Sequence, residues 1–203
     1  MEVIGGSAEV VQKHCAGFPK HIHPSDIALK LAGAGGDGAQ TAAMLLARAG
    51  INEGFDATHI PSYGPESRGG TSYADVHVAS KEVLSPASPP PHILVAFNAP
   101  SLAKFGPTVL EGGTIVHDSS VISDPPAFEG IKVYGVPFLE LATALGRPLV
   151  KNVVALGALQ AATNLFPAET LLTTIRQALA DKCALIPLNE QAFREGQRAI
   201  PQA

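Results

Sequence analysis

The stretch Ile27-Ala-Leu-Lys-Leu-Ala-Gly-Ala-Gly-Gly-Asp-Gly-Ala-Gln40 decides the fold. Its first six residues are apolar apart from one lysine, which predicts a buried strand at 27–32. The turn that follows, Gly33 to Gly38, matches the pattern G-x-G-x-x-G, and the apolar residues after it predict a helix over 39–49 that Gly50 closes. A strand that runs through a glycine turn into a helix is typical of α/β domains.

The rest of the chain continues to alternate strands and helices. We expect strands at 57–61, 72–80, 92–98, 113–120 and 131–137, and helices from residue 101 and over 138–145, 152–162, 171–180 and 189–200. The sequence therefore predicts a single α/β domain at residues 27–203, a three-layer α/β/α Rossmann-like fold with a mostly parallel or mixed sheet. Residues 1–26, which contain glycine and prolines, are expected to form an N-terminal arm outside it.

The composition argues against several classes of protein. The chain has 203 residues, a net charge of −4, no basic cluster and 5% aromatic residues, so a nucleic-acid surface is not supported. No apolar run has the roughly 18 residues that a membrane span requires, and the N-terminus does not resemble a signal peptide, so we expect a cytoplasmic protein. The two cysteines, Cys15 and Cys183, cannot hold an iron–sulfur cluster or a zinc ion by themselves.

The glycine turn is a candidate binding element through Gly33, Gly35 and Gly36. Helix-start N–H groups and the positive end of the helix dipole favour an anionic ligand there. An NAD site also requires an acid at the end of the second strand, whereas Glu53 and Asp56 precede that end. A turn that merely permits close packing is the alternative. Because residues 61–68 contain no asparagine, we interpret the similarity of residues 36–38 to a thiamine diphosphate motif as coincidental.

A polar loop follows the second predicted strand: Tyr63-Gly-Pro-Glu-Ser-Arg-Gly-Gly-Thr71. We predict that its functional residues are Tyr63, Glu66, Ser67, Arg68, Gly69, Gly70 and Thr71. The planar fork of Arg68 suits a phosphate or a carboxylate. The alternative is a local Arg68–Glu66 ion pair that only shapes the loop. Asn98, at the polar end of the 92–98 strand, is a further binding candidate because α/β folds place ligands at such ends.

The remaining histidines and cysteines form no recognisable catalytic or metal-binding motif. His59 is interpreted as a satisfied structural histidine, and the spacing of His14, Cys15, His21 and His23 does not favour a metal site. There is no G-x-S-x-G, H-E-x-x-H or P-loop lysine motif. We therefore assign no catalytic residue and no metal ligand, and expect the chain to contribute to a site rather than to complete one.

The order of these motifs resembles the gamma subunit of 2-oxoacid:acceptor oxidoreductases. The matching segments, from about residue 27 to the C-terminus, are Gly33-Ala-Gly-Gly-Asp-Gly, Ile60-Pro-Ser-Tyr-Gly-Pro-Glu-Ser-Arg-Gly-Gly-Thr-Ser, Ser85-Pro, Leu94-Val-Ala-Phe-Asn, His117-Asp-Ser-Ser and Asn152-Val-Val-Ala-Leu-Gly. The Tyr-Gly-Pro-Glu-Ser-Arg-Gly-Gly block is the most specific. Asp37 departs from the family, which more often has glutamine there.

The resemblance implies a role in oxidative decarboxylation of a 2-oxoacid with coenzyme A, which gives an acyl-CoA and carbon dioxide. It implies that electrons pass through iron–sulfur clusters to ferredoxin or a similar acceptor, and that thiamine diphosphate and magnesium lie between alpha and beta subunits. Clusters would belong to beta and to a ferredoxin-like delta subunit. The chain would then hold no cofactor alone and would line the coenzyme A side of the cavity. The rival hypotheses are a stand-alone NAD-binding dehydrogenase and a purely structural subunit.

Overall fold

The computed structural model describes residues 26–62, 71–80, 83 and 89–201. The described residues form six strands: β1 (Asp26–Ala34), β2 (Asp56–Pro61), β3 (Thr71–Ala79), β4 (Ile93–Ala96), β5 (Thr114–Asp118) and β6 (Lys132–Val136). The α-helices are α2 (Ala39–Asn52), α3 (Ala99–Phe105), α4 (Phe138–Ala144), α5 (Lys151–Thr163), α6 (Ala168–Ala178) and α7 (Ile186–Arg198). Short 3-10 helices are η3 (Gly106–Thr108), η4 (Pro148–Val150) and η5 (Ala180–Leu185).

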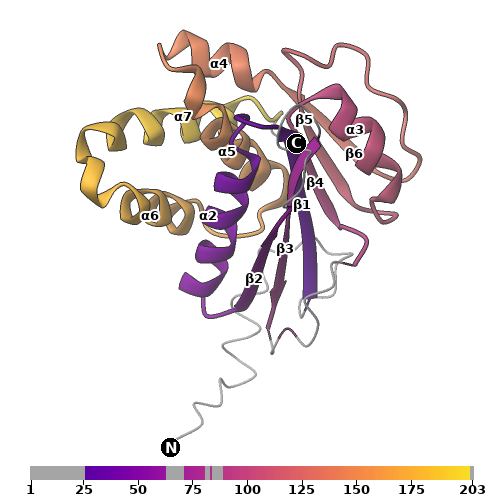
Figure 1. The fold of residues 1–203 in the computed structure, drawn as a ribbon, viewed down its shortest axis with the longest axis horizontal. Coiled ribbons are helices and arrows are strands. Elements are labelled where there is room, and N and C mark those ends of the chain that lie inside the picture. The colour runs from indigo at the N-terminus through magenta and orange to yellow at the C-terminus, as the bar shows by residue number, and fades with distance from the viewer. Residues whose placement is uncertain (1–25, 63–70, 81–82, 84–88, 202–203) are drawn as a thin grey trace, which may run out of the picture.

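The six strands form one mixed sheet in the order β2-β3-β1-β4-β5-β6 (Figure 1). The neighbours β1, β4, β5 and β6 pair in parallel, whereas β3 is antiparallel to both β1 and β2. Only β3 therefore runs against the other strands of the described sheet. The mostly parallel, mixed sheet expected from the sequence is confirmed.

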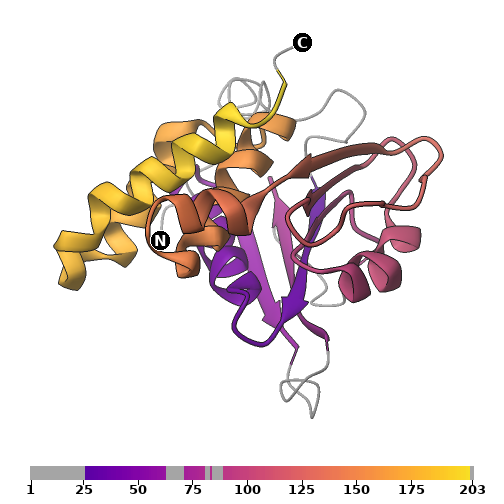
Figure 2. The same ribbon diagram turned by 90° about the horizontal axis from the view of Figure 1, so that it is seen from above.

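Helices cover both faces of the sheet, as expected for a three-layer domain (Figures 1 and 2). Alternate residues of β1 explain how. Leu29 and Leu31 belong to the large apolar core that includes side chains of α2, α4, α5, α6 and α7. Ala32 points to the opposite face, where it joins a smaller core with Leu102 and Phe105 of α3. This alternation is the two-residue period of a strand that is buried on both faces.

Helices α5 and α7 approach each other unusually closely. A Cβ atom added to Gly157 of α5 would lie 1.9 Å from the backbone oxygen of Phe193, and one added to Gly196 of α7 would lie 2.0 Å from that of Val154. Because real Cβ atoms do not tolerate such distances, each glycine makes room for the backbone of the other helix. This reciprocal contact, the α5–α7 glycine crossing, fixes the C-terminal helix to the core.

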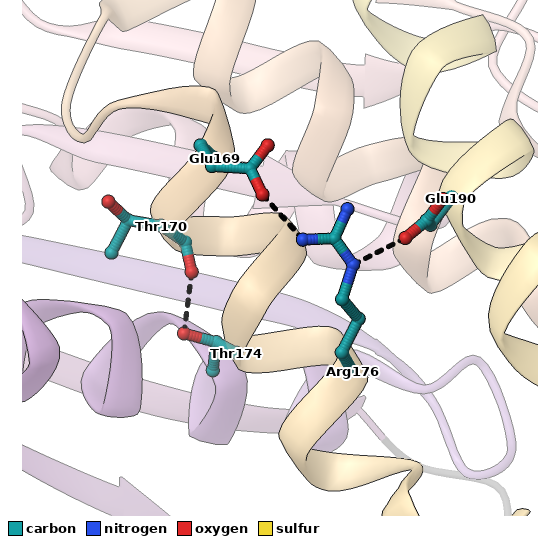
Figure 3. A network of polar contacts seen from close by, with 5 residues as sticks. All are labelled: Glu169, Thr170, Thr174, Arg176 and Glu190. Atoms are coloured by element: carbon teal, nitrogen blue, oxygen red, sulfur yellow. Dashed lines mark hydrogen bonds and ion pairs between the residues drawn. The ribbon is translucent and has the colours of Figure 1, made fainter. Parts of the chain in front are cut away.

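A polar network joins α6 to α7 at the surface (Figure 3). Arg176 of α6 donates from Nη1 to Glu169 and from Nε to Glu190 of α7, each at 2.5 Å. These hydrogen bonds, that to Glu169 first, raise the pKa of the guanidinium above its ordinary value. On the same helix Thr174 Oγ1 donates to the carbonyl of Thr170 at 2.8 Å and accepts from Asn52 Nδ2 of α2 at 2.9 Å.

Each predicted strand and helix is present, but several end elsewhere. Helix α2 does not stop at Gly50; it continues to Asn52, and Gly54, with φ of 86°, follows it. Helices α6 and α7 each begin three residues before the positions expected from their apolar pattern, at Ala168 and Ile186. Among the described residues, no helix is both long enough and apolar enough to cross a membrane.

Candidate functional site at the carboxyl end of β1

The glycine turn connects β1 to α2 in a conformation that L-residues rarely adopt. Gly36 has φ of 97°, and Gly38, the N-cap residue of α2, has φ of 84°. A Cβ atom on Gly38 would also lie 2.8 Å from Cβ of Asn152 on α5, whereas the space beside Gly36 is open. Gly38 is therefore required for packing as well as for conformation, and Gly36 for conformation alone.

Gly33 and Asp37 pack against each other inside the turn. Gly33 is the penultimate residue of β1, and a Cβ atom there would lie 2.7 Å from Asp37 Oδ2 and 2.9 Å from Cβ of Phe97. Asp37 Oδ2 accepts the N–H of Ala34 at 2.6 Å, and its Oδ1 accepts from Lys151 Nζ at 2.7 Å. Both carboxylate oxygens of Asp37 are thus engaged within the protein.

The strand register brings the second sequence block beside the glycine turn. Ala34 of β1 pairs with Thr71 of β3. The N–H of Ser62, after β2, donates to the carbonyl of Tyr73 at 2.8 Å, and Ser62 Oγ accepts the N–H of Tyr73 at 2.9 Å. The two ends of the polar loop therefore lie together at the carboxyl end of β1. Thr71 is at this position, while Tyr63, Glu66, Ser67, Arg68, Gly69 and Gly70 lie outside the described residues.

Gln40, which the sequence reasoning did not select, links the two blocks. It is the second residue of α2, and its Nε2 donates to the carbonyl of Ser62 at 3.3 Å and to Oγ of Ser72 at 3.1 Å. One side chain thus ties the start of α2 to both ends of the loop. The available signal was a polar amide in the first turn of a mostly apolar helix.

A hollow of about 440 Å³ lies over the glycine turn. Its lining comprises Ala34, Gly35, Gly36, Gly38, Ala39, Gln40, Thr41, Ser72, Leu149 and Asn152. The first turn of α2 contains no acidic residue, and its N-cap residue makes no side-chain hydrogen bond. Since α2 has 14 residues, the positive end of its dipole and its N–H groups give this hollow a preference for an anion.

Asn98 has a role in capping. Its Oδ1 accepts the N–H of Ser101 at 2.9 Å and so caps α3. Asn98 does lie at the carboxyl end of β4, as expected, but it is not among the residues that line the hollow. Its predicted contact with a ligand stays a prediction.

The histidines and cysteines offer no metal site in the described part of the chain. No group of three or more His, Cys, Asp or Glu side chains gathers there; His14, Cys15, His21 and His23 lie outside it. Our interpretation of His59 as a satisfied histidine is wrong, because its buried Nε2 lacks a hydrogen-bond partner among the described residues. Burial lowers the pKa of His59 and leaves the ring neutral at pH 7.

The order of strands in the sheet distinguishes this glycine turn from an NAD-binding site. In a dinucleotide-binding fold the second strand lies beside the first, so that its terminal acid reaches the ribose. Here β3 lies between β1 and β2. Glu53 precedes β2 and Asp56 begins it, and β2 does not adjoin β1. The geometry therefore does not support the NAD-dependent dehydrogenase that the turn suggested.

A known family matches nearly the whole domain. The model of the pyruvate ferredoxin/flavodoxin oxidoreductase family matches residues 28–199. This chain belongs to that family. The resemblance expected from the glycine turn and the polar loop is confirmed.

Relatives within the oxidoreductase family differ in length. The chain is 36% identical to ketoisovalerate oxidoreductase subunit VorA of Methanothermobacter marburgensis over 84% of its own length, but spans only 36% of that protein. It is 32% identical to 2-oxoglutarate synthase subunit KorC of Archaeoglobus fulgidus, covering 85% of this chain and 87% of KorC. The crystal structure of the keto/oxoacid ferredoxin oxidoreductase gamma subunit from Geobacter sulfurreducens superposes with a TM-score of 0.74 at 27% identity, covering 85% and 97% of the two chains.

Proposed function

We propose that this chain is the gamma-type subunit of a 2-oxoacid:acceptor oxidoreductase complex. The complex would convert a 2-oxoacid and coenzyme A to an acyl-CoA and carbon dioxide, and pass electrons to ferredoxin or a similar acceptor. Membership of the family and similarity to subunits named for ketoisovalerate and 2-oxoglutarate support the proposal. The alternatives, a stand-alone dehydrogenase and a purely structural subunit, do not explain why two polar blocks meet at one hollow.

One observation supports a role in the reaction: the glycine turn and the ends of the polar loop meet at the same hollow. Gly35 and Gly36 line the hollow together with Ser72, and Gln40 ties the ends of the polar loop to the same place. We propose that the hollow and the loop line the coenzyme A side of the active site. The α2 N-terminus and Arg68 would face the phosphates, since both favour anions.

The redox cofactors would be held by partner subunits. With only two cysteines in its sequence, this chain cannot by itself supply the four ligands of an iron–sulfur cluster. Asp37, the carboxylate in its glycine turn, is already bonded to Lys151 and to the backbone. We therefore propose alpha, beta and ferredoxin-like delta subunits as partners that supply thiamine diphosphate, magnesium and the clusters, in a cytoplasmic complex.

Purification from the native source tests the assignment. The tagged chain should copurify with thiamine- and iron–sulfur-containing subunits, and the complex should reduce a viologen dye with a 2-oxoacid only when coenzyme A is present. A panel of 2-oxoacids would then identify the substrate. Isolation of the chain alone, without this activity, would refute the proposal.

Arg68→Ala tests the coenzyme A cleft within that complex. Removal of one charge-assisted contact to a phosphate, worth about 1.5–3 kcal/mol, should raise the KM for coenzyme A by about tenfold or more. The KM for the 2-oxoacid should change little. An unchanged KM for coenzyme A in an intact complex would count against the role of the loop.

A further inference from the structure

One ion pair joins two segments whose neighbouring residues line the hollow. Asp37 belongs to the glycine turn, and Lys151 is the first residue of α5, whose next residue, Asn152, lines the hollow. Lys151 Nζ lies 2.7 Å from Asp37 Oδ1, and each side chain is only 16% exposed. The two partners are 114 residues apart in sequence, so the contact exists only in the folded domain.

The Asp37 carboxylate cannot turn away from this position. Its second oxygen accepts the N–H of Ala34 at 2.6 Å, and Gly33, which has no side chain, packs directly against it. The fold therefore fixes a negative charge two residues before α2, beside the helix end that otherwise favours an anion. Left unpaired, this charge would oppose the binding of phosphate groups in the hollow.

We infer that Lys151 is a positioning residue for coenzyme A, which holds Asp37 in the turn and cancels its charge beside the hollow. The inference rests on the proposed function, because it takes the anionic ligand to be coenzyme A. Lys151 and Asp37 thus act as a pair, in which the positive charge of the lysine neutralises the carboxylate that would otherwise repel an anionic ligand.

The inference is tested in the purified complex with charge-changing variants. Lys151→Met should raise the KM for coenzyme A by about tenfold, since the unpaired charge of Asp37 is largely buried and its neighbours Gly36 and Gly38 line the hollow. Both kcat and the KM for the 2-oxoacid should change by less than about twofold, because nothing in the pair touches the 2-oxoacid. Lys151→Arg, which keeps the charge, should behave like the wild type.

The double variant separates charge from structure. Asn at position 37 keeps an oxygen for the N–H of Ala34 but carries no charge, so Asp37→Asn combined with Lys151→Met should restore the KM for coenzyme A to within about threefold of the wild type. Asp37→Asn alone should leave that KM unchanged or lower it. A double variant as impaired as Lys151→Met, or an increased KM in Asp37→Asn alone, would overturn the charge-cancelling role.

Arg68→Ala distinguishes failure of this inference from failure of the proposed function. If Arg68→Ala raises the KM for coenzyme A but Lys151→Met does not, the role of Lys151 is refuted and the cleft stands. If neither variant alters it in an assembled complex, the cleft itself is refuted. Thermal unfolding of each variant shows whether a kinetic change stems from loss of structure. If Lys151→Met fails to assemble, the KM for coenzyme A of the milder variant Asp37→Asn still tests the inference.

Discussion

At the scale of single residues, Gln40 connects parts of the site that the sequence presents separately. Gln40→Leu removes its hydrogen bonds to Ser62 and Ser72 while keeping a side chain of similar size. We expect the free energy of unfolding to fall by about 1–2 kcal/mol, at about 1 kcal/mol for each hydrogen bond. Urea denaturation measures this loss, and the KM for coenzyme A should rise in the complex because both ends of the loop are released.

Gln177→Leu is the matched control for Gln40→Leu. Gln177 is an exposed glutamine of α6 that accepts a hydrogen bond from Asn52, at the C-terminal end of α2. Its replacement should change stability by less than about 0.5 kcal/mol, as is usual for surface positions, and should leave the KM for coenzyme A unaltered. Equal kinetic effects of the two variants would show that Gln40 has no special role.

His117 gives the domain a dependence on pH. The residue is 3% exposed at the end of β5, and burial lowers its pKa from the ordinary value of 6.5, outweighing the opposing effect of Asp118. The unfolded chain takes up a proton near pH 6.5 that the folded chain resists. The contribution of neutral His117 to the free energy of unfolding is therefore fully present above pH 6.5. It is lost as the pH falls below this value, by up to about 1.4 kcal/mol per pH unit for each such histidine.

His117→Leu tests this pH dependence. Urea denaturation at pH 7.5 and pH 5.5 should show a smaller difference in unfolding free energy for the variant than for the wild type. His59, whose pKa burial also lowers, accounts for part of the remaining difference. Identical pH profiles for the variant and the wild type would show that His117 does not titrate between the two states.

At the scale of secondary-structure elements, the α5–α7 glycine crossing is the most sensitive contact of the core. Gly157→Ala and Gly196→Ala each place a methyl group about 2 Å from a backbone oxygen of the other helix. The helices must separate to accept it, and we expect each substitution to reduce the free energy of unfolding by about 3 kcal/mol or more. Chemical denaturation followed by circular dichroism measures the loss.

Gly50→Ala is the matched control within α2. Gly50 is also a buried helical glycine, but a Cβ atom there would meet Phe166 and Val78 at 3.4 Å, an ordinary contact. Because alanine favours a helix over glycine by about 1 kcal/mol, this substitution should be neutral or stabilising. A similar loss in all three variants would mean that glycine at the crossing has no particular function.

The sequence predicts the elements better than the contacts between them. Strands such as 93–96 and the helix from Ala39 are evident because each is a continuous or nearly continuous apolar run of suitable length. Their ends are less evident: α2 runs through Gly50 to Asn52, and the glycine with a positive φ that follows the helix is Gly54. The position of β3 between β1 and β2 depends on pairing across the sheet, which no local pattern encodes.

The candidate site could be predicted only in part for the same reason. Gly35, Gly36 and Thr71 were selected from local composition, and the structure does bring them together. Gln40 and Lys151 were not selected, because their roles depend on hydrogen-bond partners that are distant in sequence and that no local pattern reveals. Asn98 illustrates the opposite case, since a polar residue after a strand also serves as a helix cap.

At the scale of the whole molecule, the sheet order makes a prediction about nucleotide cofactors. With β3 beside β1, no acid from the second strand can reach a ribose held over the glycine turn. The purified chain should therefore show no saturable binding of NADH in calorimetric titrations up to about 1 mM, a weak-binding limit near −4 kcal/mol. A dissociation constant well below this limit would restore the dehydrogenase hypothesis.

The α5–α7 glycine crossing also has a consequence for synthesis on the ribosome. Helix α5 is buried on nearly every side, and its glycine face accepts only a backbone as close as that of α7. During translation, the face of α5 that packs against α7 therefore remains uncovered until residues 186–198 have emerged. This face of the core cannot close before α7 has been synthesised. Chaperones that bind exposed apolar helices would meet the nascent chain in this interval.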